Sequence, residues 1–136
     1  MQKESTITNM KTTKLLWPIV AILLLVAAIS SCEKYNPFDV EEVIFPKDGG
    51  EMVIHTEPGG YGICIYNSDN NENPASAPYS VDGIERVSKD WLTVELDRNN
   101  SKITLSAEQN NTGKQRRLRI NMMVQNRGGM IPVIQE

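Results

Sequence analysis

Apolar and polar residues alternate in short runs from Val40 to the end of the chain, and turn signals separate the runs. The alternation is clearest in the segment 115–126, which has one apolar face and one mainly polar face. The faces carry Leu118, Ile120, Met122 and Val124 on one side and Arg117, Arg119, Asn121 and Met123 on the other. This period of two is typical of an antiparallel sheet that is buried on one side and wet on the other.

Seven segments follow this pattern, and we expect each to form a strand. They are 40–45, 51–56, 61–67, 91–97, 102–108, 115–126 and 130–136. Seven short strands in about one hundred residues, with no helical period, predict an all-β fold, an immunoglobulin-like antiparallel β-sandwich over 40–136. Pro132 cannot donate a hydrogen bond to a neighbouring strand, so its strand is expected at an edge or bulged there. The segment 68–80 has no pattern and is predicted to be a long loop.

The beginning of the chain has the organisation of a secretory signal. Lys11 and Lys14 precede an apolar run of fifteen residues, 15–29. A membrane-spanning helix needs about 20 apolar residues, so this run is short for one. A basic start, a short apolar centre and small residues after it are typical of a signal peptide. Either Met1 or Met10 can be the start, because the signal does not need the first nine residues.

Cys32 ends this segment, in the sequence Ile-Ser-Ser-Cys at 29–32. The tetrapeptide resembles the lipobox of bacterial lipoproteins. The resemblance implies that residues 1–31 are a lipoprotein signal peptide, that Cys32 carries a diacylglycerol, and that the new amino terminus is acylated, as with palmitate. Several acyl chains anchor a protein stably, whereas one binds only marginally. The alternative is an uncleaved anchor in which the cysteine has no role.

This reading places the protein in the cell envelope, anchored to a bacterial membrane through Cys32. We expect residues 32–39 to be a lipidated tether, because they are polar, aperiodic and contain Pro37. The expected membrane is the outer one, at its periplasmic or surface face.

Charge and cysteine content narrow the possible partners. Removal of residues 1–31 changes the formal net charge from −3 to −5, because three lysines and one glutamate are lost. A mildly acidic domain attracts neither nucleic acid nor anionic lipid. Cys64 is then the one thiol besides Cys32, so no disulfide is expected within the domain. Its apolar surroundings predict an inert core residue.

Residues for catalysis or metal binding are not found in a suitable pattern. His55 is the one histidine, and it has no cysteine or carboxylate at ligand spacing. Asp69, Asn71 and Asn73 match the first positions of a calcium loop, but the required glycine and glutamate are missing. No serine lies in a nucleophile elbow. We therefore expect a protein without catalytic residues, metal or cofactor.

Aromatic side chains are the remaining candidates for a binding site. Tyrosine rings can stack on the apolar face of a sugar, while amides and carboxylates bond its hydroxyls. Tyr61 and Tyr79 flank loops with glycine and proline, and Asn70 and Asn71 offer amides nearby. These four residues are the candidate glycan-binding residues. Trp91 opens an alternating strand, and we expect it in the core.

Residues 90–136 resemble the BACON domain, the Bacteroidetes-associated carbohydrate-binding often N-terminal domain. The matching elements are Trp-Leu-x-Val at 91–94, Ile-x-Leu at 103–105, Asn-x-x-Gly-x-x-Arg at 110–116 and Val-x-Gln at 133–135. The segment 43–56 matches more loosely, and a tyrosine stands at 61 where a typical member has a tryptophan nearby. The resemblance implies an immunoglobulin-like sandwich, an envelope setting and association with glycan-processing proteins. It does not imply catalysis.

Two functions remain open. The first is a membrane-anchored, non-catalytic lipoprotein that binds carbohydrate or mucin-like ligands. The alternative is a structural or assembly module that holds an envelope protein through a sheet edge. Exposed tyrosines beside the loop 68–80 would favour the first function, and an apolar patch elsewhere would favour the second. Because the last predicted strand ends the sequence, we expect binding or assembly rather than a spacer role.

Overall fold

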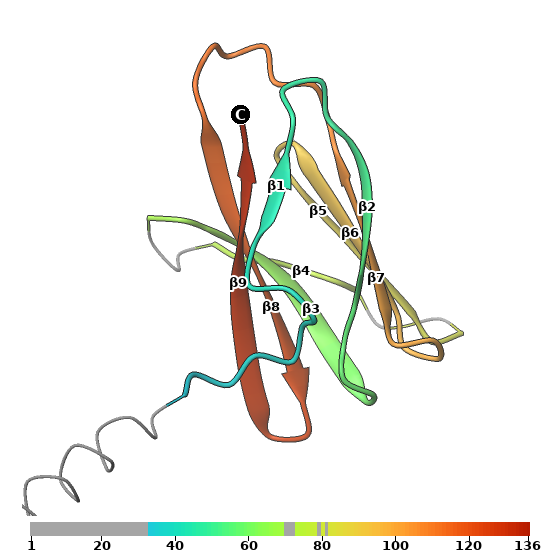
Figure 1. Cartoon of the computed structure of the whole chain (residues 1–136). Helices are drawn as coiled ribbons and strands as arrows, with labels where there is room; N and C mark the ends of the chain where they lie inside the picture. The colour runs from blue at the N-terminus through green and yellow to red at the C-terminus, as the bar shows by residue number, and fades with distance from the viewer. Residues whose placement is uncertain (1–32, 70–72, 79, 81) are drawn as a thin grey trace, which may run out of the picture. The chain divides into compact units, whose positions relative to one another are not determined.

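The computed structural model describes residues 33–69, 73–78, 80 and 82–136, which form an all-β protein (Figure 1). A compact unit spans Tyr35–Glu136 and contains all the residues of the hydrophobic core. These described residues include no helix long and apolar enough to cross a membrane. The predicted signal peptide and Cys32 lie outside the described residues.

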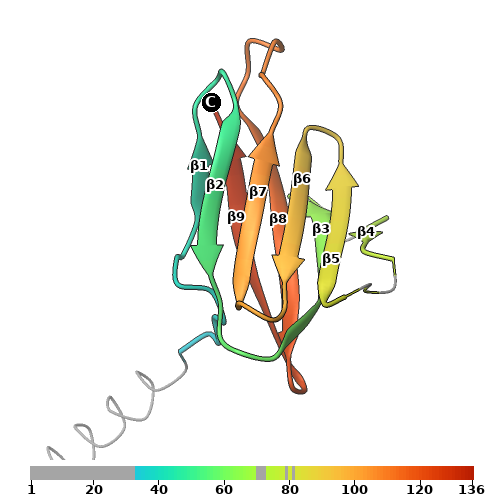
Figure 2. The ribbon, with the colours of Figure 1, turned by 90° about the vertical axis from the view of Figure 1, so that its right-hand side faces the viewer.

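The strands form the two sheets of a sandwich (Figure 2). One sheet has the order β1 (Val43–Phe45), β9 (Arg127–Gln135), β8 (Arg116–Val124), β3 (Gly60–Asn67) and β4 (Ala75–Ser76). The other has the order β2 (Gly50–His55), β7 (Lys102–Ala107), β6 (Leu92–Asp97) and β5 (Ile84–Lys89). All pairs are antiparallel except β1 with β9. The orders β2-β7-β6 and β3-β8-β9 are those of strands B-E-D and C-F-G in an immunoglobulin-like sandwich, which confirms the predicted fold class.

The core lies between the two sheets and follows the alternation of the sequence. The apolar face of β8 points inward, as predicted, and its four residues are at most 6% exposed. The largest apolar side chains that are fully buried beside it are Phe45, Ile63, Ile65, Leu92, Leu96, Ile103 and Leu105. Trp91 is also buried, as predicted, and the Arg116 guanidinium lies 4.9 Å from the centre of its ring. This stacking adds a cation–π contact to the burial of the ring.

Two strands were not expected from the sequence. β4 is only two residues long and lies within the predicted loop 68–80. β5 has an inverted pattern at its start, because Ile84 is exposed and Glu85 is buried. Neither strand therefore shows the usual alternation of apolar and polar residues. The described residues form nine strands, where the sequence predicts seven.

The predicted tether is shorter than expected, because Tyr35–Asp39 packs onto the sandwich. Phe38 is 6% exposed and forms an isolated antiparallel bridge with Thr56. The Pro37 carbonyl accepts a hydrogen bond from the Glu57 N–H at 2.8 Å. The domain thus begins at Tyr35 rather than at 40, and only Glu33 and Lys34 separate it from Cys32. A single bridge has no period, which is why the sequence pattern missed this segment.

Pro132 lies at a local edge of its sheet, as the sequence predicts. β9 as a whole lies between β1 and β8. However, β1 pairs only with Val133–Gln135, so within the described part of the chain no strand flanks Pro132 on the side away from β8. The half of β9 that contains the proline is therefore an edge, where a missing N–H leaves no partner unsatisfied.

Buried polar residues close one end of the sandwich. The Gln135 side chain is fully buried, and its amide donates to the carbonyls of Pro46 and Glu108 at 3.1 and 2.7 Å. Arg116 Nε donates to the Gln135 side-chain oxygen at 2.8 Å. Asn110 donates to the Lys114 and Glu136 carbonyls in the same region. The asparagine, arginine and glutamine of the quoted motifs therefore have structural roles, since Asn110 and Gln135 satisfy backbone carbonyls and Arg116 holds the Gln135 side chain.

Candidate functional site

A cleft of about 570 Å³ opens beside Tyr61, a predicted site residue. We call it the Tyr61 cleft. It lies where β3, the segment after β4, the start of β5 and the turn after β6 come together. Its lining residues are Tyr61, Gly62, Ala77, Pro78, Ser80, Gly83, Glu85 and Arg98. These positions are far apart in the sequence, so only the sandwich brings them together.

A β-bulge in β3 shapes one wall of the cleft. Tyr61 pairs with Met123 and Cys64 with Asn121, so β3 uses three steps where β8 uses two. Gly62 lies inside this bulge with a φ of +68°, a conformation that side-chain-bearing residues seldom adopt. Bulges bend a strand and redirect its side chains and N–H groups. Here the bulge turns the Gly62 N–H toward Glu85.

Glu85 is the most unusual residue of the cleft. Its strand β5 points it inward, and it is only 9% exposed. Both carboxylate oxygens accept the Gly62 N–H, at 3.2 and 3.1 Å. Among the described residues, no lysine, arginine or histidine forms an ion pair with it. A carboxylate has about four acceptor positions, so Glu85 can accept further hydrogen bonds from a molecule in the cleft.

Tyr61 and Arg98 give the cleft an aromatic surface and a positive charge. Tyr61 is 38% exposed, and its hydroxyl donates to the Gln125 carbonyl. This hydrogen bond fixes the orientation of the ring before any ligand binds. Arg98 lies in the turn after β6, and its backbone N–H donates to the Gly83 carbonyl at 2.9 Å. Its guanidinium has no ion-pair partner in the described part of the chain.

The structure describes only one of the four predicted glycan-binding residues. Tyr61 lines the cleft. Tyr79, Asn70 and Asn71 lie outside the described residues. The sequence neighbours of Tyr79 are Pro78 and Ser80, and both line the Tyr61 cleft. Glu85 and Arg98 were missed by the sequence analysis. An inward-facing glutamate next to an outward-facing isoleucine was the available signal for Glu85, but only if 84–89 had been recognised as a strand.

Cys64 is not the core residue that the sequence predicts. Ile63 and Ile65 on either side of it are fully buried, and Cys64 is half-buried on the opposite face of β3. Its sulfur lies 3.3 Å from the Ser76 hydroxyl and 3.5 Å from the Gly62 carbonyl. The reason is the alternation itself: the two isoleucines take the core side, so the residue between them faces outward.

His55 is exposed and lies near one carboxylate. Its Nδ1 is 3.6 Å from the Asp39 carboxylate, and its backbone N–H donates to the same side chain at 3.0 Å. No group of three or more metal-ligating side chains occurs among residues 33–69, 73–78, 80 and 82–136. A second hollow of about 320 Å³, lined in part by Lys47, Asn110 and Glu136, belongs to the end with the buried polar residues. The Tyr61 cleft is therefore the candidate site.

Comparisons with known proteins inform the fold but not the site. No protein-family model matches the chain, and no curated protein matches it. Among solved structures, the chain is similar to an NMR structure of a protein from Bacteroides thetaiotaomicron, with a TM-score of 0.54. The match covers 78% of this chain and 92% of that chain, at 10% sequence identity. At this identity the similarity supports a shared fold and nothing finer.

Proposed function

We propose that this protein is a membrane-anchored, non-catalytic envelope lipoprotein that binds carbohydrate in the Tyr61 cleft. The observation that carries the proposal is the buried Glu85 carboxylate, which faces a cleft of about 570 Å³ together with an exposed tyrosine ring. The resemblance to BACON domains supports the same ligand class. Cys32 carries the lipid in this proposal, and its lipobox-like sequence supports that role.

The chemistry of the cleft suits a saccharide. A sugar ring has an apolar face that stacks on an aromatic ring, and hydroxyls around its edge that donate and accept hydrogen bonds. Tyr61 supplies the ring, and its hydroxyl is already bonded to the Gln125 carbonyl. Glu85 accepts from two neighbouring hydroxyls of the sugar, and Arg98 donates to a hydroxyl or ring oxygen. A buried carboxylate with one N–H donor gains more from such bonds than an exposed one does.

The small number of contacts that the cleft offers argues for weak binding. A few stacking and hydrogen-bonding contacts must first offset the several kcal/mol that association costs. We expect dissociation constants on the order of micromolar to millimolar for single oligosaccharides. Many anchored copies on one membrane would raise the effective affinity for a polymeric glycan.

Calorimetric titration of residues 33–136 with host and plant glycans tests the proposal. Tyr61→Ala should abolish measurable binding, whereas Tyr61→Phe should retain it, because stacking needs the ring and not the hydroxyl. Glu85→Gln should weaken binding roughly tenfold or more, as expected for loss of charge-assisted hydrogen bonds. Glu95→Gln is the matched control, since Glu95 pairs with Arg86 at 3.4 Å and does not line the cleft.

Tyr79→Ala belongs to the same titration series, because Tyr79 is flanked by two lining residues. We expect it to weaken binding as Tyr61→Ala does. Thermal melts of all variants establish that the fold is intact. The proposal is wrong if the wild-type domain binds no glycan of a broad panel, or if Glu85→Gln and Tyr61→Ala bind as well as wild type.

A further inference from the structure

Two edge strands lie side by side on one side of the sandwich. β1 ends the five-stranded sheet and β2 ends the four-stranded sheet, and Figures 1 and 2 show them next to each other. In an immunoglobulin-like sandwich a further strand, A, pairs with strand B on its outer side. Here only Phe38 takes that place beside β2, through its bridge to Thr56, before the chain continues into β1. Most of the outer edge of β2 is therefore left without strand A.

The backbone of β2 shows which groups this edge offers. The His55 N–H donates to the Asp39 carboxylate, and the His55 carbonyl accepts the Asp39 N–H, both at 3.0 Å. The backbone of His55 thus points away from β7. Every second residue of a strand directs its backbone groups the same way, so Val53 and Glu51 present their N–H and carbonyl groups on this edge. Within the described residues no strand pairs with them, and such an edge is a template for another strand.

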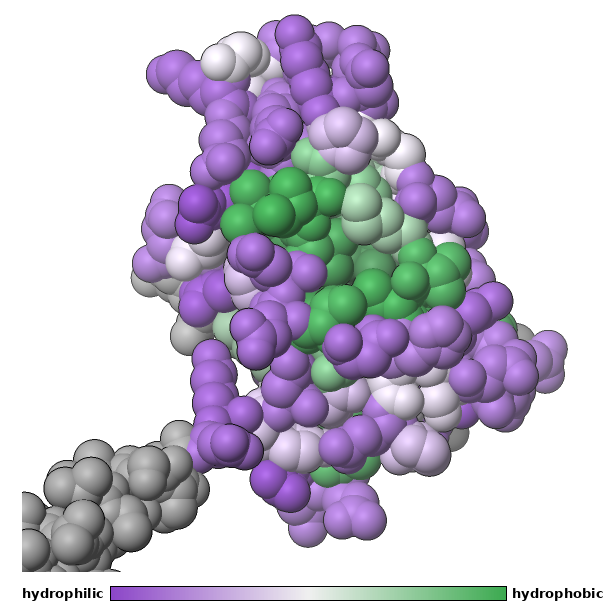
Figure 3. Space-filling model, viewed as in Figure 1, coloured by the Kyte–Doolittle hydropathy of each residue, from purple (hydrophilic) through white to green (hydrophobic). Residues whose placement is uncertain are grey.

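Apolar side chains are exposed at the same place. Val53 on β2 is 49% exposed and Ile44 on β1 is 46% exposed, the two highest values among the exposed large hydrophobic residues. Val40 and Met52 are half-buried against the core beside them. Figure 3 shows that apolar surface gathers over β1 and β2 and is bordered by hydrophilic residues. We call the surface formed by Val40, Ile44, Met52 and Val53 the β1–β2 surface.

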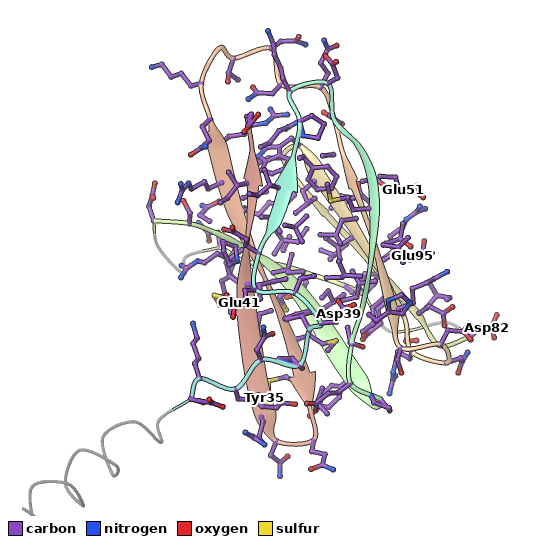
Figure 4. The ribbon with its side chains drawn as sticks, viewed as in Figure 1. Tyr35, Asp39, Glu41, Glu51, Asp82 and Glu95 are labelled. Atoms are coloured by element: carbon purple, nitrogen blue, oxygen red, sulfur yellow. The ribbon has the colours of Figure 1, made fainter. Side chains whose placement is uncertain are left out.

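The border of the β1–β2 surface is acidic. The segment 39–57, which contains β1, β2 and their connections, has six carboxylates and a single lysine, Lys47. Asp39 and Glu41 lie by the chain that leads into β1, and Glu51 lies beside β2 (Figure 4). Among the described residues, Asp39 forms the one ion pair of this segment, with His55. The other carboxylates are thus available to a basic partner.

We propose that the β1–β2 surface binds an extended polypeptide segment in which aliphatic residues alternate with lysine or arginine. The segment adds as a strand beside β2 and takes up the N–H and carbonyl groups of Glu51 and Val53. Strand addition of this kind obtains affinity from the backbone and specificity from alternate side chains. Glu51 and Val53 are two positions apart and share one face of β2, so the basic side chains of the added strand lie on that face, with the charge near Glu51 and the aliphatic stem over Val53. The aliphatic side chains lie on the other face, toward the half-buried Met52.

A second copy of this chain fits the surface less well than a basic segment does. Pairing β2 with β2 of another copy would bring two acidic borders together, and like charges close to each other destabilise a strand pair. The β1–β2 surface shares no lining residue with the Tyr61 cleft. This proposal is therefore independent of saccharide binding. It concerns the alternative function as an assembly module, and it names the surface of that module and the kind of partner that the surface binds.

The test is a calorimetric titration of residues 33–136 with an acetylated and amidated octapeptide of alternating valine and lysine. We expect a dissociation constant on the order of 10–100 μM that rises with salt, because the contacts are exposed charges and a short strand. A peptide with glutamate in place of lysine should not bind. In a backbone NMR titration the amide signals of Glu51 and Val53 should shift most.

Two variants of the protein locate the site. Val53→Lys and Glu51→Lys should each weaken peptide binding at least tenfold, since each puts a positive charge beside the added strand. The matched control is Ile84→Lys, because Ile84 is also exposed, at 36%, but lies on β5 at the far edge of the same sheet. It should bind the peptide as wild type does. Thermal melts check that each variant is folded.

Three results would overturn the proposal. The first is equal binding of the glutamate peptide, which would show that charge plays no part. The second is undiminished binding by folded Val53→Lys and Glu51→Lys, which would place the peptide elsewhere. The third is a wild-type dimer in sedimentation that Val53→Lys converts to a monomer, which would make a second copy the occupant.

Discussion

At the scale of single residues, neighbours in one strand have opposite roles because the strand alternates. Ile63 and Cys64 differ by one position, yet one is fully buried and the other is half-buried among polar groups. The same rule makes Glu85 face inward, next to the exposed Ile84. An inward carboxylate breaks the pattern that stabilises a sandwich, and such exceptions are expected at functional sites.

The pair Ile63 and Cys64 provides a direct test of this assignment. Ile63→Ala should reduce the free energy of unfolding by about 2–5 kcal/mol, because it leaves a cavity in the core. Cys64→Ser should change it by less than about 1 kcal/mol, because the serine hydroxyl can keep the contacts with Gly62 and Ser76. Urea denaturation followed by tryptophan fluorescence measures both. A larger loss for Cys64→Ser than for Ile63→Ala would mean that the faces of β3 are reversed.

Asp97 contributes to stability in a pH-dependent way. The Asn100 side-chain amide donates to it at 2.7 Å, and the backbone N–H groups of Asn99 and Asn100 also donate. These hydrogen bonds, that of the Asn100 side chain first, hold the pKa of the Asp97 carboxyl below its usual value of 3.8. A lowered pKa stabilises the folded state above the unfolded pKa, and this stabilisation is lost as the pH falls through the folded value.

The Asp97→Asn variant should show this dependence. We expect it to be less stable than wild type at about pH 6 and to approach wild type as the pH falls through the lowered pKa of the folded state, because the wild-type carboxyl then becomes protonated too. Urea denaturation of both proteins at pH 6 and at a series of lower pH values measures the difference. A gap that stays constant with pH would indicate that the ionised carboxylate has no role in the β6–β7 turn.

At the scale of elements, two glycines let distant segments pack closely against a strand. The bulge of β3 brings Gly62 to Glu85, and β9 provides a surface for the segment Tyr35–Phe38. At Gly129 a Cβ atom would lie 2.0 Å from Pro37 Cδ, so only glycine allows this packing. Tyr35 also stacks under Arg127 of β9, 3.8 Å from guanidinium to ring centre. The segment before β1 is therefore part of the domain.

Gly129→Ala should displace the segment 35–38 from β9. We expect a loss of about 1–3 kcal/mol in the free energy of unfolding, which is typical of overpacking against a rigid neighbour. Gly128→Ala is the control, since its Cβ would meet the flexible Met123 sulfur at 3.0 Å and the Asn121 side-chain amide at 3.7 Å, and no backbone atom. Urea denaturation gives the stabilities, and hydrogen exchange reports on the bridge between Phe38 and Thr56. Equal stability of the two variants would show that the packing of Pro37 on Gly129 contributes little.

At the scale of the whole molecule, the two surfaces proposed to bind saccharide and polypeptide lie on different parts of the sandwich. The Tyr61 cleft lies between β3 and the start of β5, and the β1–β2 surface lies at the edge formed by β1 and β2. If Cys32 is lipidated, two residues connect the lipid to the first packed residue, Tyr35. The three backbone steps from Cys32 to Tyr35 span at most about 11 Å, so the domain would remain close to the membrane surface.

The anchor itself is tested by Cys32→Ser. The variant should keep residues 1–31 and take up no acyl label, because it lacks the thiol that is proposed to carry the lipid. Expression in a bacterium that processes lipoproteins, with labelled palmitate and mass spectrometry of the product, measures both. Cys64→Ser is the matched control and should be processed and labelled like wild type. Normal processing and labelling of the Cys32→Ser variant would contradict the proposal that the protein is a lipoprotein.

The sequence by itself determined the fold class, seven of the nine strands that the described residues form, and the inward position of residues such as Trp91 and Leu118. Alternation is a local property, so it reports which face of a strand is buried wherever the strand is long enough to show it. The tertiary structure decided the pairing order, the docking of Tyr35–Phe38 and the approach of Gly62 to Glu85, which lies 23 residues further along the chain. These features depend on contacts between distant segments, whose relative energies no local pattern encodes. β4 and the bridge of Phe38 are also too short to show an alternation of apolar and polar residues. In β5 the alternation is not recognisable, because one of its inward residues is the carboxylate Glu85.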